Sequence, residues 1–210
     1  MRETRLIKKL KKGSNEALRV FYKENAPKFK YLIYRYVGNE DIAEDLLQDG
    51  FMCIMEKISQ FSGTGSFEGW SRRIIINLAL EYLRKNKRLI FSDTELIESV
   101  KSDSDQENQA FVNEIDIDDL SADKVNMEVI YAANFTDGEL EEALGLLPEH
   151  YRVVFNLFSI DGYKHKEISK MLAINEKTSK SRLSKARKIT QSYLYKKAIE
   201  RLKEKQYEAR

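Results

Sequence analysis

Apolar and polar residues alternate along most of this chain with the period of an α-helix. A clear example begins at Pro148, which suits the first position of a helix because the N–H that it lacks would be unbonded there. The apolar residues that follow recur at helical spacing: Tyr151, Val154, Phe155 and Phe158. Asp161-Gly162 is typical of a helix end. The pattern therefore predicts a helix from about 148 to 160 with one apolar face.

A second, shorter helix is predicted from 164 to about 172. Its inward-facing residues are Ile168, Met171 and Leu172. A tight turn is expected at 173–175, where Asn175 can accept a hydrogen bond from the first turn of the next helix. That helix begins at Glu176, whose charge suits the positive end of a helix. Two short helices joined by such a turn form a helix-turn-helix, and the second helix of this motif usually lies in the DNA major groove.

The predicted last helix has two different faces. Its core side combines Ser179, Leu183 and Ala186. Its outer side carries hydrogen-bond donors and no carboxylate: Lys177, Lys180, Ser181, Ser184, Lys185 and Lys188. Lysines can neutralise phosphates and can donate to guanine O6 and N7. The alternative is the solvated basic face of an ordinary surface helix.

Three longer helices are predicted in the first 90 residues, from 15 to about 36, from 40 to about 59 and from 67 to about 86. Ser14, Asn39 and Ser66 are their expected N-caps. Pro27 is expected to kink or divide the first of them. Its aromatic residues are expected in the core: Phe21, Tyr22, Phe29, Tyr31, Tyr34 and Tyr36.

Composition agrees with an all-α fold, because 210 residues include only two prolines and nine glycines. The single cysteine, Cys53, excludes an internal disulfide and suits a reducing compartment. The charged N-terminal stretch does not resemble a signal peptide. No apolar run reaches the roughly 18 residues of a membrane helix, so direct membrane insertion is not expected. We expect a cytoplasmic location instead.

Charge divides the chain into three parts. The net charge is +7 over residues 1–90, −14 over 91–142 and +9 over 143–210. Basic blocks could face nucleic acid, whereas the acidic middle would be repelled by it. The sequence therefore predicts two small helical domains, 1–90 and 139–210, joined by an acidic, flexible linker at 91–138.

The C-terminal block resembles region 4 of extracytoplasmic-function (ECF) sigma factors, a group within the sigma-70 family of bacterial transcription initiation subunits. The matching residues are Leu147-Pro148, Arg152, Val154-Phe155, Gly162-Tyr163, Glu167-Ile168 and Thr178 to Arg187. Many members have Val where this chain has Ser179. The resemblance implies recognition of the promoter −35 element. The residues expected to contact it are Lys164, Lys177, Thr178, Lys180, Ser181, Arg182, Ser184, Lys185 and Lys188.

The segment DIAEDLLQDGFMCIMEKISQF and the following SFEGWSRRIIINLALEYLRKNKR are similar to sigma region 2. The resemblance implies that the acidic helix binds core RNA polymerase through Asp41, Glu44, Asp45, Gln48 and Asp49. A helix-dipole preference would explain the first acidic residues but explains Asp49 poorly. The resemblance also implies that the loop at 61–66 and the next helix hold the melted −10 element. The residues expected there are Phe61, Ser62, Trp70, Arg72, Arg73, Asn77, Arg84, Lys85 and Arg88.

Catalysis finds no support in the sequence. Its two histidines, His150 and His165, lie on different predicted helices, and no glycine-rich phosphate loop or cysteine cluster is present. A calcium-loop register at Asp103, Asp105, Glu107 and Glu114 lacks its glycine, so no metal or cofactor is expected.

The predicted protein is thus a non-enzymatic initiation factor that binds core RNA polymerase and promoter DNA. The family implies a cognate anti-sigma factor as a further partner. The alternative is a free-standing helix-turn-helix regulator that binds duplex DNA without polymerase.

Overall fold

The computed structural model describes residues 2–86 and 125–208 of the chain. The chain divides into two compact units, Met1–Arg88 and Leu89–Arg210. Within the described ranges all regular structure is helical, which confirms the predicted all-α class.

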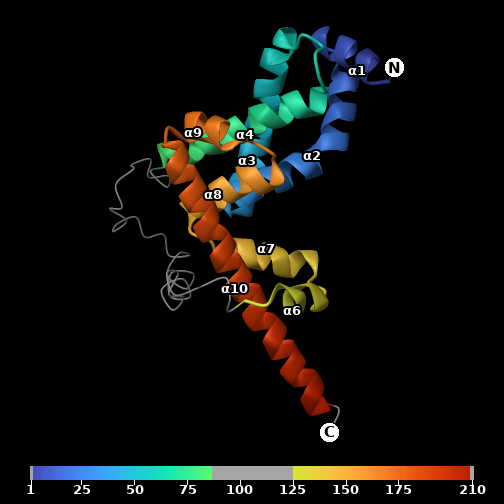
Figure 1. The fold of residues 1–210 in the computed structure, drawn as a ribbon. Coiled ribbons are helices and arrows are strands. Elements are labelled where there is room, and N and C mark those ends of the chain that lie inside the picture. Colours follow the sequence, from blue (N-terminus) through green and yellow to red (C-terminus); the bar gives the residue numbers. More distant parts are fainter. Residues whose placement is uncertain (1, 87–124, 209–210) are drawn as a thin grey trace. The chain divides into compact units, whose positions relative to one another are not determined.

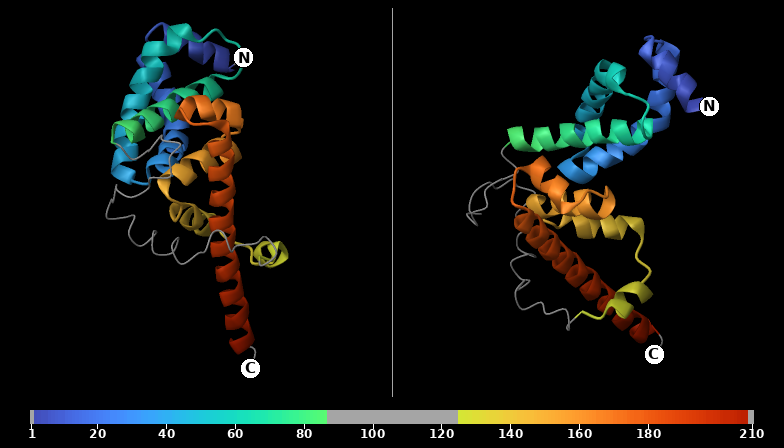
Figure 2. Two further views of the ribbon diagram at one scale, coloured as in Figure 1. Left: turned by 60° about the vertical axis from the view of Figure 1, so that its left-hand side comes forward. Right: turned by 45° about the horizontal axis from the view of Figure 1, so that its top comes forward.

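Between residues 2 and 86, the first unit has four helices and one 3₁₀ turn: α1 (Arg2–Lys11), α2 (Asn15–Val37), α3 (Glu40–Lys57), η1 (Ile58–Gln60) and α4 (Phe67–Lys85). The three predicted N-caps are confirmed, since the side chains of Ser14, Asn39 and Ser66 accept backbone N–H groups of the helices that they precede. Helices α2, α3 and α4 pack on one another, and α1 packs on α2 and η1 (Figure 2).

The helix α2 is continuous through Pro27, which is exposed, so of the two predicted effects the proline does not divide the helix. A further expectation for α2 was wrong. Three of the aromatic residues expected in the core are exposed instead: Tyr22, Tyr31 and Tyr34. The buried ones are Phe21, Phe29 and Tyr36. The reason is geometric, because these three lie on the side of α2 that α3 and α4 cover, and the other face is left to solvent.

Aromatic rings from three helices fill the centre of this unit. The ring centroid of Phe21 lies 5.4 Å from that of Phe51 on α3 and 5.1 Å from that of Phe67 on α4. Gly50 allows α3 and α4 to approach closely, because a Cβ at this position would lie 2.3 Å from Cδ1 of Ile75. The packing fixes the acidic helix α3 and the helix α4 on one rigid core.

Over residues 125–208, the second unit has five helices and one π-helical turn: α6 (Met127–Ala132), α7 (Asp137–Gly145), α8 (Glu149–Phe155), η3 (Asn156–Ile160), α9 (His165–Leu172) and α10 (Glu176–Glu208). Pro148 occupies the cap position rather than the first helical position, since its ψ of 141° is extended. Gly162 ends the α8–η3 segment with a φ of +76°. Leu147, Tyr151, Ala186 and Ile189 form a buried cluster between α8 and α10.

Helix α10 is 33 residues long and extends well beyond the helix-turn-helix (Figure 1). Its C-terminal part packs against α6 and α7 through a buried cluster of Ile130, Ala143 and Leu194. The tail therefore packs back on its own domain. The last part of the segment predicted as a flexible linker with short helical pieces contains α6, and Ile130 of this helix packs in the same buried cluster.

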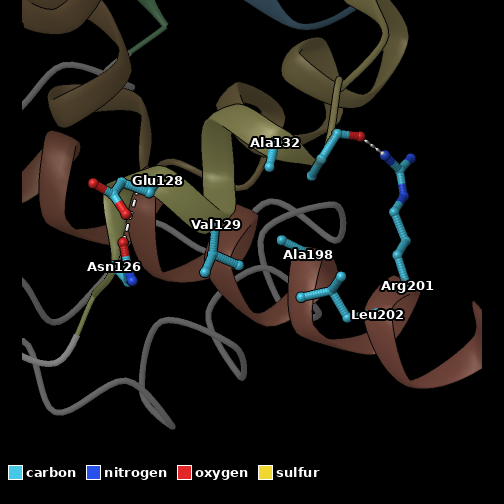
Figure 3. A pocket seen from close by; sticks show the side chains of 8 residues that line it. Asn126, Glu128, Val129, Ala132, Ala198, Arg201 and Leu202 are labelled. Atoms are coloured by element: carbon cyan, nitrogen blue, oxygen red, sulfur yellow. Dashed lines mark hydrogen bonds between the residues drawn. The ribbon is translucent and has the colours of Figure 1, made fainter. Parts of the chain in front are cut away.

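Polar contacts also join the C-terminal part of α10 to α7 and to the residue that follows α6. A guanidinium nitrogen of Arg201 donates to the carbonyl of Ala133 at 2.8 Å, and Arg201 also pairs with Glu139. The amino group of Lys197 lies 2.6 Å from a carboxylate oxygen of Glu142. Between α6 and α10 remains a pocket of about 290 Å³, and Figure 3 shows Arg201 at one end of it with its bond to the backbone.

Candidate nucleic-acid interface

The helix-turn-helix forms as the sequence predicts. The backbone N–H of Lys164 donates to the Glu167 carboxylate at 2.9 Å, which satisfies the entry to α9. Ala173 ends α9 in the left-handed region with a φ of +53°. The Asn175 amide oxygen then accepts the N–H of Lys177 at 2.8 Å, which confirms it as the cap of α10. The turn is therefore defined at both ends by local hydrogen bonds.

A polar contact joins the two helices of this motif. Ser179 is fully buried, and its Oγ lies 2.9 Å from Nδ1 of His165 at the start of α9. The His165 ring also stacks on Phe158, with ring centroids 4.4 Å apart. Burial, followed by the charge of Lys180, lowers the pKa of His165. Ser179 is thus accommodated in the interior by a hydrogen bond that an aliphatic side chain could not make.

The buried and exposed faces of α10 follow the predicted pattern. Ser179, Leu183 and Ala186 are buried. The exposed members of the predicted DNA-binding set are Lys164, Lys177, Lys180, Ser181 and Ser184. The partly buried members are Thr178, Arg182, Lys185 and Lys188. The structure therefore gathers donors on one side of the recognition helix, with Lys164 at the start of α9.

One expectation for this face was wrong. It does contain a carboxylate, because Glu176 pairs with Lys180 at 3.0 Å, one helical turn away. A glutamate in the first turn suits the positive helix end and reaches the lysine four residues later. In the absence of DNA, the Lys180 charge is thus partly neutralised.

Helix α8 places an imidazole beside two cations of the recognition helix. Burial, followed by the charges of Arg182 and Lys185, lowers the pKa of His150 to about 4. Its Nε2 atom is buried and makes no hydrogen bond with the described part of the chain. His150 is therefore neutral at physiological pH and adds no positive charge beside these two residues.

In the first unit, α3 presents most of its predicted acidic surface to solvent. Asp41, Asp45, Gln48 and Asp49 are exposed. Glu44 is partly buried and pairs with Lys30 of α2 at 2.8 Å, and this contact raises the pKa of Lys30. The carboxylates that remain exposed along one face of α3 can bind a basic partner surface.

The loop between η1 and α4 is exposed except at its two ends. Residues 62–66 are exposed, and the hydroxyls of Ser62 and Thr64 lie 2.6 Å apart. Phe61, expected to contact DNA, is instead 5 % exposed, with its ring centroid 5.3 Å from that of Phe67. Trp70 is partly buried and stacks on Phe67. Phe61 and Trp70 thus both pack against Phe67, and their contact with DNA stays a prediction.

Exposed polar residues of α4 recur at intervals of about one or two helical turns and so form one polar face. Arg73 and Asn77 are exposed four residues apart, and Arg84 follows on the same side two turns later. Arg72 is partly buried, and Lys85 is exposed but pairs with Glu81 at 2.9 Å. Arg88 and the carboxylates of the calcium-loop register lie outside the described residues.

Helix α1 contributes two contacts to this loop for which the sequence carries no signal. The amino group of Lys11 donates to the carbonyl of Phe61 at 2.8 Å. The carboxylate of Glu3 accepts the N–H of Phe67 at 3.1 Å. Periodicity could have predicted α1 itself, but contacts about 50 to 64 positions apart leave no local signal.

No group of three or more metal-ligating side chains occurs in the ranges 2–86 and 125–208. Cys53 is partly buried on α3. In the same ranges, the helices are too short or too polar to span a membrane.

The fold and these surfaces define a class of all-helical proteins with two units. One unit contains a helix-turn-helix, and the other presents an acidic face on α3 and a basic face on α4. Residues 21–89 match the family model "Sigma-70 region 2", and residues 137–189 match "Sigma-70, region 4". Together these two segments cover more than half of the chain, which belongs to the sigma-70 family. Helix α1 lies outside both matched segments.

Named relatives agree with this assignment. The chain is 29% identical to the ECF RNA polymerase sigma factor SigE of Mycolicibacterium smegmatis over 85% of its own length and 62% of that protein. It is 28% identical to the ECF RNA polymerase sigma factor SigW of Bacillus subtilis over 90% of its length and 94% of that protein. A solved structure of the sigma factor RpoE bound to the anti-sigma factor NepR from Bartonella quintana aligns with a TM-score of 0.47 at 22% identity, covering 84% of this chain and 97% of that one.

Proposed function

We infer that this protein is a transcription initiation factor that binds core RNA polymerase and directs it to promoters with specific −10 and −35 elements. The observation that carries this inference is the pairing of the region 2 and region 4 segments in one chain. A free-standing helix-turn-helix regulator would need only the second of them. The protein would act by binding rather than by catalysis, in the cytoplasm where the polymerase works.

For polymerase binding, the exposed face of α3 is the proposed surface. Asp45, Gln48 and Asp49 share this face, and Asp41 and Glu44 lie one turn earlier. Glu44 forms an ion pair with Lys30. On binding, Glu44 would either exchange this partner for a polymerase residue or keep it at the edge of the interface. We therefore place most of the interaction on the exposed Asp45 and Asp49.

For the −10 element, the loop at 61–66 and the polar face of α4 are the proposed surface. Arg73 and Arg84 would hold phosphates of the unpaired strand, and the Asn77 amide could pair with a base edge. The hydroxyls of the exposed loop add donors and acceptors to the same site. Phe61 and Trp70 act here through the support that they give to the loop.

For the −35 element, the N-terminal half of α10 is the proposed recognition helix. Lys177, Ser181 and Ser184 are exposed on its outer side and are free to approach base edges and phosphates. Lys180 would exchange its Glu176 partner for a phosphate. We further propose that an anti-sigma factor binds the free protein, as in the complex of the RpoE relative with NepR.

Co-elution with bacterial core RNA polymerase tests the proposed function. The wild-type protein is expected to co-elute, and the Asp45→Ala, Asp49→Ala double variant is expected to lose the interaction. A matched control removes two exposed carboxylates from the second unit, Glu141→Ala with Glu200→Ala, and should co-elute like wild type. If wild type binds duplex DNA but never co-elutes, the free-standing regulator becomes the better description.

A further inference from the structure

Helix α1 is held firmly against the rest of the first unit. Leu10 is 1 % exposed, and Leu6 and Ile7 are partly buried, so one side of α1 faces the unit. The chain reverses at Gly13, whose φ is +73°, and Ser14 then caps α2. Because α1 is anchored by its own apolar residue and by a defined turn, its polar side chains have fixed origins.

Two of those side chains reach the two ends of the loop that precedes α4. Lys11 donates to the Phe61 carbonyl at 2.8 Å where the loop begins. Glu3 accepts the Phe67 N–H at 3.1 Å where the loop ends. Residues 3 and 11 are about 12 Å apart along the helix axis, so α1 lies alongside the whole loop.

Both contacts satisfy backbone groups that secondary structure leaves open. The N–H of Phe67 is one of the first four of α4, which have no partner within their helix. Ser66 satisfies a second one, the N–H of Gly69, at 2.9 Å. Glu3 thus acts as a second cap that comes from a distant part of the chain. It is also the one carboxylate in residues 2–12, a segment with six Lys and Arg.

The five residues between these ends have few restraints of their own. Gly63 and Gly65 have φ of +84° and +81°, and no atom lies within 4 Å of a Cβ built on either of them. The contact between the Ser62 and Thr64 hydroxyls is internal to the loop. Without fixed ends, such a loop would sample many conformations.

We propose that α1 is a positioning element of the −10 site, in which Glu3 and Lys11 fix the loop at 62–66 in the shape that receives the unpaired promoter strand. The proposal rests on the proposed function. Each tie is a hydrogen bond to a charged group, which is stronger and more directional than a neutral one. By holding the loop before DNA arrives, α1 removes part of the ordering cost of binding.

The experiment uses the full-length chain assembled with core RNA polymerase. The DNA probe is a promoter that the wild-type holoenzyme selects from a random-sequence duplex library, prepared both as a full duplex and with its −10 segment unpaired. Lys11→Met removes the donor, and Lys11→Arg retains it. Lys12→Met is the matched control, because it removes one exposed positive charge from the next position. Glu3→Ala removes the acceptor, and Glu3→Gln retains an amide oxygen.

The expected result is specific to the ties. Lys11→Met and Glu3→Ala should each weaken binding to the unpaired probe about threefold to tenfold, with core polymerase affinity and unfolding temperature near wild type. The variants Lys11→Arg and Lys12→Met should stay close to wild type, and Glu3→Gln, which keeps an acceptor without its charge, should lie between wild type and Glu3→Ala. In the free protein, the Phe67 amide should exchange faster with solvent in Glu3→Ala.

Two outcomes would overturn the inference. Equal losses for Lys11→Met and Lys12→Met would mean that α1 acts only through its overall charge. Unchanged binding of the unpaired probe by Lys11→Met and Glu3→Ala would mean that the hydrogen bonds from α1 are not needed to position the loop. If instead the wild-type holoenzyme fails to form or selects no promoter, the proposed function itself fails, and this inference falls with it.

Discussion

The partly buried His150, whose Nε2 atom is inaccessible to solvent, should make the second unit less stable in mild acid. Its ring is covered on α8, and Arg182 and Lys185 of α10 add positive charge nearby. All three effects disfavour the imidazolium form in the folded state, so the pKa of His150 falls from 6.5 to about 4. In the unfolded chain the ring is hydrated and has its ordinary pKa.

The sign of the effect follows from proton uptake. Between pH 6.5 and 4 the unfolded chain binds a proton at His150 that the folded chain does not, so acid favours unfolding. The contribution is complete above about pH 7 and is lost progressively as the pH falls to 4. A pKa change of this size corresponds to at most about 3 kcal/mol.

Two histidines in the whole chain make the measurement direct. Imidazole proton resonances of wild type, assigned with His150→Gln and His165→Gln variants, should give one titration near pH 4. Urea unfolding of wild type and His150→Gln at several pH values should show that the loss of stability between pH 6.5 and 4 is smaller in the variant. The carboxylates titrate in both proteins, so the difference isolates His150.

A His150 resonance that titrates near pH 6.5 would refute this reasoning. The same conclusion would follow if His150→Gln lost as much stability as wild type over this range. Either result would mean that water reaches the ring in the folded state.

Three further predictions follow from local geometry. The buried contact between Ser179 and His165 should be worth about 1 kcal/mol as the coupling energy of a double-mutant cycle with alanine at both positions, and additive single effects would contradict it. Asn39→Ala removes the acceptor for the Ile42 N–H. It should lower the free energy of unfolding of the first unit by about 1 kcal/mol, measured by urea unfolding followed by tryptophan fluorescence. An unchanged midpoint would mean that water replaces the cap. Ala173→Gly should slow amide exchange in α9 and α10 by relieving the left-handed backbone, a gain of up to about 1 kcal/mol, and faster exchange would show that glycine's extra freedom in the unfolded chain outweighs the relief.

Local signals in the sequence were enough to predict most helices. Asn39, Ser66 and Asn175 cap the helices that they were expected to cap, because an N-cap bond joins residues only two or three positions apart. The buried side of α10 likewise follows from the helical period. The family segments supplied the expected surfaces, whose assignment to polymerase and DNA stays a prediction.

What the sequence could not provide depends on tertiary neighbours. Tyr31 has the same local signal as Phe29, and only the positions of α3 and α4 decide that one is exposed and the other buried. The burial of Phe61 depends in the same way on Phe67 and Trp70. The packing of the tail on α6 and α7 joins residues more than 50 positions apart.

The continuous α10 sets a rule for how this unit can change in length. One continuous helix carries both Ser181, on the outer side of the helix-turn-helix, and Leu194, which packs against α6. Each residue added between them would turn the far end by about 100°. An insertion of one or two residues would swing Leu194 out of its cluster, whereas seven residues would restore the angle and shift the tail by two turns. The angular register of α10 thus makes whole turns the unit in which its length can vary.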